Sequence, residues 1–131
     1  MILVDSSVWI DYFNGNRTWQ TDLLDESLSY RPIIIGDLIL TEVLQGFKSD
    51  KDVKAAKSHL DALPFMQIGG YDVALKSAQN YRSLRKKGVT VRKTIDVLIA
   101  TFCIIEGLTL LHDDRDFDPM VSHLSLKELR P

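Results

Sequence analysis

Short apolar runs alternate with longer amphipathic segments along the whole chain. Residues 2–4, 33–35, 65–68 and 108–111 are apolar runs with the length expected of buried strands, and several are rich in β-branched side chains. The segments between them carry apolar residues at helical spacing. Strands that alternate with helices form parallel sheets joined by crossover helices. The pattern predicts an α/β protein with three layers, α/β/α, around a central, mostly parallel sheet of four to five strands.

The helix boundaries are marked by capping residues and breakers. We expect a first helix after Asp5, ended by Gly15, and further helices at 18–28, 38–44, 51–63, 71–87 and 95–106. Asp50 and Thr94 are the expected N-caps of the fourth and sixth of these. The sixth helix is apolar on almost every side, so it should be buried. Residues 122–126 are the candidate for a last edge strand.

The chain has the size of one domain. Its 131 residues contain no linker, repeat or low-complexity segment, so we predict a single domain over residues 1–131. No run of about 18 apolar residues is present, and the short N-terminal run is unlike a secretory signal. Cys103 is the only cysteine, which excludes an internal disulfide and fits a small buried hydrophobe. These features favour a cytoplasmic protein with no membrane association.

Acidic residues stand where an α/β fold would bring them together. Asp5 ends the first apolar run, Asp114 and Asp116 follow the last one, and Glu42 and Asp96 interrupt apolar helices. Ligands of open parallel sheets bind outside the carboxyl ends of the strands. Carboxylates gathered there repel one another unless a positive charge lies between them, and a hard divalent cation is the natural candidate. No cluster of Cys or His suggests zinc, so all-oxygen ligation favours Mg²⁺ or Mn²⁺ and phosphodiester hydrolysis.

Each acid also has a simpler structural interpretation. Asp5 is a good helix N-cap, and Asp96 gains from the dipole at a helix start. Glu42 could lie on a solvated helix face, and residues 112–118 could form an ordinary polar turn. Two of these positions follow strand ends and two interrupt apolar helices, and this coincidence favours a shared site.

Four segments resemble PIN-domain nucleases, and most closely the VapC-type toxins of toxin–antitoxin pairs. The matching segments are VDSSVWI at 4–10, LTEVLQG at 40–46, RKTIDVLIA at 92–100 and LLHDDRDF at 110–117. The resemblance implies cleavage of RNA with Mg²⁺ or Mn²⁺, restraint by a cognate antitoxin, and assembly as a homodimer or a toxin–antitoxin hetero-oligomer. It implies that the catalytic residues are Asp5, Glu42, Asp96 and Asp114, with Asp116 as a further metal ligand.

The resemblance also suggests individual roles. Asp5, Asp96 and Asp114 would form the inner ligand set, and Asp116 would bind a second metal or anchor the first ligands. Glu42 would orient the attacking water or remove its proton. The hydroxyl residue of the family matches Ser6 or Ser7. His112 departs from the family, in which many members have Thr, Ser or Asn, and it is expected to be a hydrogen-bonding neighbour or a nucleic-acid contact rather than a ligand.

A basic stretch precedes Asp96. The net charge of −2 argues against a nucleic-acid partner only if the acids of the site are counted as free. Cations at a helix end are common, so the stretch could be an ordinary solvated end. Alternatively, it forms a phosphate-binding rim, with Arg92 and Lys93 as the best candidates. The expected RNA contacts are Ser6, Arg92, Lys93 and His112.

Aromatic residues near the N-terminus are candidates for an antitoxin groove, although core packing is the default: Trp9, Tyr12, Phe13, Trp19 and Phe47. Two other functions compete with the ribonuclease. The first is a non-catalytic α/β regulatory module that binds a protein partner. The second is a phosphotransfer domain with an aspartyl nucleophile, which would need a paired acid after the first strand, where Ser6 stands instead.

Overall fold

The computed structural model describes residues 1–131 and contains one parallel sheet of four strands in the order β3–β2–β1–β4. The strands are β1 (Ile2–Val4), β2 (Ile33–Gly36), β3 (Phe65–Met66) and β4 (Thr109–Leu111). In the centre of the sheet, Leu3 lies opposite Ile34 on one side and Leu110 on the other. All three pairings are parallel, as predicted from the alternation of strands and helices.

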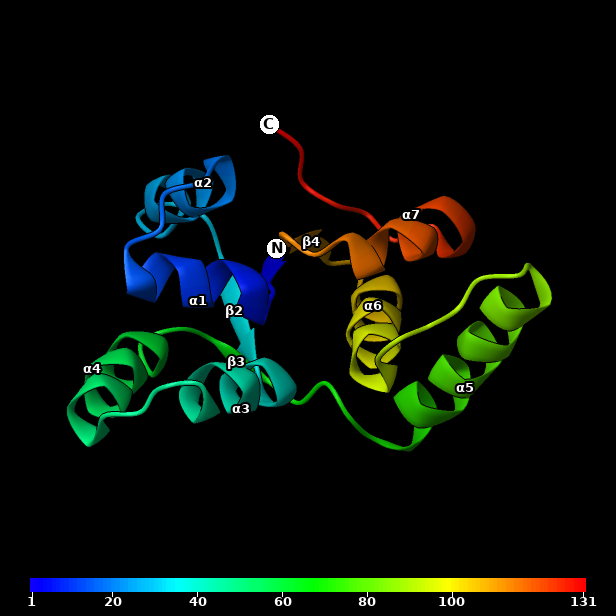
Figure 1. Ribbon diagram of the computed structural model, residues 1–131, viewed down its shortest axis with the longest axis horizontal. Coiled ribbons are helices and arrows are strands. Elements are labelled where there is room, and N and C mark those ends of the chain that lie inside the picture. Colours follow the sequence, from blue (N-terminus) through cyan, green and yellow to red (C-terminus); the bar gives the residue numbers. More distant parts are fainter.

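Helices cover both faces of this sheet. Figure 1 shows α1 to α4 on one side of the strands and α5 to α7 on the other. The three-layer α/β/α architecture is therefore confirmed. The helices are α1 (Ser6–Asn14), α2 (Trp19–Ser27), α3 (Asp37–Gln45), α4 (Asp50–Leu60), α5 (Tyr71–Lys86), α6 (Thr94–Glu106) and α7 (Asp118–Leu124), with a short 3₁₀ turn, η1 (Arg115–Phe117), before α7.

The core lies between the sheet and the helices that flank it. Every residue of β1 and β2 is buried, because both faces of a central parallel strand are covered. Helix α6 buries most of its surface, as its composition predicted, and Cys103 is fully buried within it. No helix combines the length and the apolar character needed to cross a bilayer.

Capping explains most helix boundaries, with two corrections. Asp5 caps α1 and Gly15 ends it in the left-handed conformation at φ 74°, as expected. The N-cap of α4 is Ser49, whose hydroxyl accepts a hydrogen bond from the backbone N–H of Asp52. Asp50, the expected N-cap, is therefore the first residue of the helix. The N-cap of α6 is Lys93, which makes no side-chain cap, and Thr94 is the first residue of the helix.

The prediction of an edge strand at residues 122–126 is wrong. Most of these residues belong to α7, which begins at Asp118 with Pro119 in its first turn. Proline fits the first turn of a helix because its missing N–H would have no partner there. The pairing with the sheet occurs slightly later, where the backbone of Leu110 bonds to Lys127 and Leu129. The C-terminal segment therefore extends the sheet beside β4.

The strand order places a switch point between β1 and β4. The chain moves outward from β1 to β2 and β3, then returns to the other side of β1 for β4. Crossovers on the two sides of β1 run in opposite directions, and this leaves a crevice outside the carboxyl ends of β1 and β4. The amide of Asp5 donates to the carbonyl of Leu111 at 2.9 Å, which fixes the two strand ends side by side.

Candidate metal centre

Asp5 connects the end of β1 with the start of α1. Its Oδ2 accepts hydrogen bonds from the backbone of Ser7 at 3.1 Å and from the Ser7 hydroxyl at 2.7 Å. The structural interpretation of Asp5 as an N-cap is therefore correct, yet its carboxylate also interacts with the charge of Asp114. Burial raises the pKa of Asp5, the two hydrogen bonds from Ser7 only partly offset this effect, and the charge of Asp114 adds to it.

Asp96 lies in the first turn of α6 and is only 3% exposed. Its Oδ2 is buried and receives no hydrogen bond; the ammonium of Lys93 stands 3.4 Å away as an ionic neighbour. Burial raises the pKa of Asp96 to about 6, despite the opposing charge of Lys93. A buried carboxylate oxygen without a donor is costly, so this atom needs a further positive group.

The turn after β4 presents Asp114 and Asp116 on the same side as Asp96. Each of these three residues places a carboxylate oxygen within 4.8 Å of the others. The backbone N–H of Asp116 donates to Asp114 Oδ1 at 2.9 Å, so the η1 turn is itself capped by Asp114. Burial alone would raise the pKa of Asp114, but this backbone bond and Lys93 lower it.

Lys93 occupies a position that the sequence did not predict. Its ammonium bridges Asp114 Oδ2 at 3.1 Å and Asp96 Oδ2 at 3.4 Å. Burial opposes the charge on Lys93, but the two carboxylates outweigh it and raise the pKa of Lys93. The sequence suggested a divalent cation as the positive charge between these carboxylates, and Lys93 shows that the chain supplies part of that charge itself.

Glu42 reaches the centre from α3. The hydroxyl of Ser6 donates to Glu42 Oε1 at 3.2 Å and so links the carboxylate to the start of α1. Burial and the charge of Asp5 raise the pKa of Glu42, while Lys93 acts in the opposite direction. Glu42 is therefore part of the same electrostatic group and does not lie on a separate solvated face.

The remaining predicted residues lie around this group. Arg92 is exposed and its Nη1 is 3.7 Å from Asp116 Oδ1. His112 lies at the end of β4 with its ring nearly buried, and both ring nitrogens are hydrogen-bonded, to the backbone of Asp114 and to Glu128. This environment leaves little of the ring for an RNA contact.

One residue near the site, Glu128, lacked a signal in the sequence. Ser7 had one, as the alternative to Ser6 for the family's hydroxyl residue, and the structure uses both: the Ser7 hydroxyl donates to Asp5 and accepts a hydrogen bond from the backbone N–H of Asp113 at 3.0 Å. Glu128 approaches from the C-terminal segment, 16 residues after His112. Only the return of this segment to β4 brings it near, and no local pattern predicts that return.

The group of residues fits a hard divalent cation. Its donors are carboxylate oxygens, one of which is buried without a hydrogen-bond donor, and no thiolate or free imidazole is among them. Burial raises the pKa of Asp5, Glu42 and Asp96, so their negative charge is undercompensated. Asp96, Asp114 and Asp116 could hold the ion, with Asp5 alongside.

Fold and site together define a class of α/β proteins with an all-oxygen candidate metal centre at the switch point of a parallel sheet. The family model described as PIN domain matches residues 2–121. The chain belongs to the PIN domain family.

Curated relatives and solved structures agree with this assignment. The chain is 31% identical over 120 residues to Ribonuclease VapC11 of Mycobacterium tuberculosis, which covers 90% of each protein. It has the same fold as the solved structure of VapBC2 from Rickettsia felis bound to a promoter DNA fragment, with a TM-score of 0.78, 18% identity and 98% of each chain covered. The sarcin–ricin-loop-cleaving toxin VapC20 of M. tuberculosis superposes with a TM-score of 0.73 at 15% identity, over 100% of both chains.

Proposed function

We propose that the protein is a metal-dependent endoribonuclease that hydrolyses RNA phosphodiester bonds and acts as the toxin of a VapBC-type toxin–antitoxin pair. The 31% identity to a VapC ribonuclease supports the activity. The observation that carries the metal is the buried Oδ2 of Asp96, which lacks a hydrogen-bond donor beside Asp114 and Asp116. Mg²⁺ or Mn²⁺ is the ion that such oxygen ligands favour.

The residues have separate tasks in this proposal. Asp96, Asp114 and Asp116 hold the cation, and Asp5, whose charge interacts with Asp96 and Asp114, is a further ligand beside them. When bound, the cation supplies Lewis acidity, which lowers the pKa of water and neutralises charge on the phosphate. Glu42, fixed by Ser6, accepts the proton of the attacking water, and its raised pKa suits this task because a general base works best near the working pH. The water oxygen bonds to phosphorus, the P–O ester bond breaks, and the leaving oxygen takes a proton from solvent water.

RNA would approach through an open hollow of about 710 Å³ beside the turn. Every residue that lines it is polar: Arg92, Lys93, Asp113, Asp114, Arg115 and Asp116. Arg92 is the better candidate for a phosphate contact, since its side chain is 77% exposed while Lys93 is engaged by two carboxylates. Ser6 would act on RNA only through Glu42, to which it is bonded.

An antitoxin would dock on the N-terminal helices. Phe13 and Phe47 meet at 5.9 Å between their ring centroids and line a hollow of about 220 Å³ together with residues of α4. Trp9, by contrast, is buried in the core. A basic side chain of the antitoxin could also enter the carboxylate group, because Lys93 shows that an ammonium fits there. A homodimer or a hetero-oligomer and a cytoplasmic location remain part of this proposal.

The competing functions receive less support. A non-catalytic regulatory module would not need a buried carboxylate that lacks a donor. An aspartyl nucleophile at position 5 would have to attack with a carboxylate whose Oδ2 already accepts two hydrogen bonds from Ser7.

The direct test maps new RNA ends in total RNA after expression of the protein, with Asp96→Asn as the control. The ribonuclease produces ends at defined positions that disappear in Asp96→Asn and upon chelation of the metal. Identical ends from both proteins would refute the proposed role of the site, and the absence of ends in the presence of Mn²⁺ would favour the regulatory module.

A further inference from the structure

We propose that His112 is a positioning residue, which holds the backbone of Asp114 so that the turn after β4 aims its carboxylates at the metal centre, and that Glu128 of the C-terminal segment holds His112 in place. The inference rests on the proposed metal site. It gives His112 a role that the resemblance to PIN-domain toxins left open.

The hydrogen bonds of His112 determine its tautomer. The backbone N–H of Asp114 donates to Nδ1 at 3.2 Å, so Nδ1 must be the unprotonated nitrogen. The proton of the neutral ring is therefore on Nε2, which donates to Glu128 Oε2 at 2.6 Å. Each nitrogen has one partner of the complementary kind, and the ring connects the C-terminal segment with the turn that carries Asp114.

Other contacts fix both ends of this connection. The ring of His112 packs against the ring of Phe117, with 5.0 Å between the centroids. The backbone carbonyl of His112 accepts a hydrogen bond from the side-chain amide of Gln20 at 3.4 Å. Glu128 is held by the backbone bonds of its neighbours to Leu110 and by Arg130, whose Nη2 is 3.1 Å from Glu128 Oε1. Rotation of the His112 ring would break its bonds to Asp114 and Glu128 and its packing against Phe117. Rotation of the Glu128 side chain would break its contacts with His112 and Arg130.

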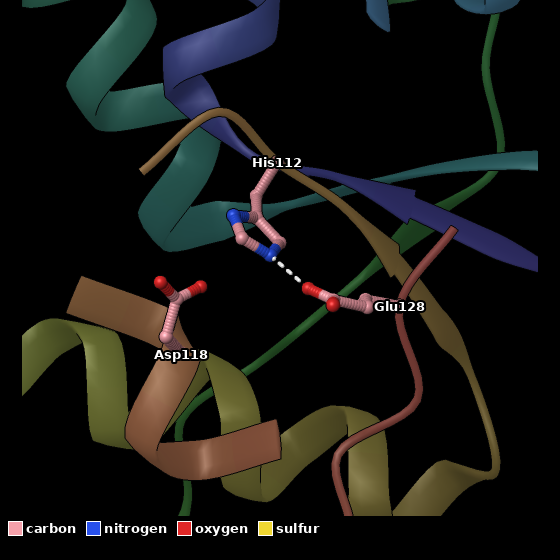
Figure 2. A group of neighbouring side chains, drawn as sticks. All are labelled: His112, Asp118 and Glu128. Carbon is pink, nitrogen blue, oxygen red and sulfur yellow. Dashed lines mark hydrogen bonds and ion pairs between the residues drawn. The ribbon is translucent and has the colours of Figure 1, made fainter. Parts of the chain in front are cut away.

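A second metal site is the alternative at this place, because His112, Asp118 and Glu128 have possible ligand atoms within 4.8 Å of one another. Figure 2 shows Asp118 on α7 beside the other two, with the only dashed line between His112 and Glu128. To bind a metal at Nε2, the ring would have to move its proton to Nδ1, where it would face the N–H of Asp114. Two donors would then point at each other, so the structure favours the positioning role.

The hydrogen bond between His112 and Asp114 affects the geometry of the metal ligands. Asp114 Oδ1 accepts a hydrogen bond from the backbone N–H of Asp116. The position of the Asp114 backbone therefore influences the carboxylates of both Asp114 and Asp116. Residues that orient metal ligands typically alter metal affinity about 10- to 100-fold when they are changed. Loss of the bond between His112 and Asp114 should therefore weaken metal binding about tenfold or more.

Two substitutions of His112 test the roles of its two ring nitrogens separately. His112→Asn places an amide oxygen near the position of Nδ1, so it can still accept from Asp114 but cannot reach Glu128. His112→Gln places its terminal amide near the position of Nε2 and lacks an acceptor for the N–H of Asp114. Two changes of Glu128 form a matched pair, since Glu128→Gln keeps an oxygen for Nε2–H and Glu128→Ala removes it.

The test measures the dissociation constant of Mn²⁺ on the intact protein by titration calorimetry and by electron paramagnetic resonance of free Mn²⁺, with no RNA present, and records the melting temperature of each variant. We expect His112→Gln and Glu128→Ala to weaken Mn²⁺ binding about tenfold, and Glu128→Gln to remain within about threefold of the unchanged protein. His112→Asn keeps the acceptor for Asp114 but loses the contact with Glu128, so it should weaken binding less than His112→Gln does. Asp118→Asn should bind Mn²⁺ as the unchanged protein does.

Three outcomes would overturn the inference. The first is wild-type affinity in His112→Gln and Glu128→Ala, and the second is affinity that follows the melting temperature equally in all variants. The third is a loss in Asp118→Asn as large as that in His112→Gln, which would indicate a second metal site. If His112→Gln does not fold, the pair Glu128→Ala and Glu128→Gln decides the question. Asp96→Asn is the reference: if it retains full Mn²⁺ binding, the proposed function itself fails, whereas its loss together with unchanged His112 variants refutes only the positioning role.

Discussion

Replacement of Asp96 by Asn should stabilise the metal-free protein at neutral pH. Burial raises the pKa of Asp96 from 3.8 to about 6, so the folded state binds a proton more tightly than the unfolded state between these pH values. Because the folded state holds more protons there, the free energy of unfolding falls as the pH rises from about 4 to about 6, and it stays lowered above that. At about 1.4 kcal/mol for each pH unit, the full loss from this residue is about 3 kcal/mol. The amide introduced by Asp96→Asn has no charge to desolvate and escapes this loss.

The assay is urea denaturation of both proteins with a chelator present, at pH values from 4 to 7.5. We expect equal stability near pH 4 and an advantage of up to about 3 kcal/mol for Asp96→Asn at pH 7.5, equivalent to roughly 10 °C in melting temperature for a chain of this size. The difference between the two proteins reports Asp96 together with its charge interactions with Lys93, Asp5 and Asp114, since the titrating groups other than Asp96 are common to both.

Saturating Mn²⁺ should reverse the order. A ligand that binds only the folded state stabilises it, and Asp96→Asn loses most of that binding. If the two proteins show the same dependence on pH in the chelator, Asp96 is not the desolvated carboxylate described here. If Mn²⁺ stabilises both equally, Asp96 is not a ligand.

Three further substitutions test other parts of the site. Asp5→Asn should keep the cap of α1, because an amide oxygen can accept both bonds from Ser7, while RNA cleavage and Mn²⁺ affinity are lost; cleavage at an undiminished rate contradicts a ligand role. Lys93→Gln removes the ammonium that competes for Asp96 and Asp114, so calorimetry should show several-fold tighter Mn²⁺ binding, and weaker binding would mean that Lys93 supports the metal. Arg92→Gln, made in the inactive Asp96→Asn protein so that RNA stays intact, should reduce the slope of log K for RNA binding against log salt by about 0.7, and an unchanged slope excludes a phosphate contact.

The central fold was predictable because its signals are local. Strands β1 and β2 are buried throughout and β4 is buried at Leu110 and Leu111, so these segments are largely apolar in the sequence. Glycines end α1 and α6. The C-terminal region was less predictable. The short α7 begins at Asp118–Pro119, a helix-start signal that the weak apolar alternation of residues 122–126 obscured. The pairing of residues 127–129 with Leu110 depends on the return of the chain and has no local signature.

The acidic residues of the site were predictable because the strand order of a parallel α/β sheet brings residues at neighbouring strand ends together. Asp5 and Asp114 follow adjacent strands, and this adjacency follows from the strand order. The cations and hydrogen-bond donors around them were not predictable in detail. Lys93 was expected to face RNA, but the turn before α6 directs its ammonium inward, and only three-dimensional placement shows which charge it meets.

Lys93 also changes the electrostatic argument for the metal. The ammonium compensates part of the negative charge, yet it leaves Asp96 Oδ2 without a hydrogen bond, and Asp5 and Glu42 keep raised pKa values. The repulsion that remains between the carboxylates destabilises the folded protein, and a bound cation would relieve it. Stability and metal affinity are therefore linked through the same carboxylates, so a substitution that relieves the repulsion should strengthen the fold and weaken the site together.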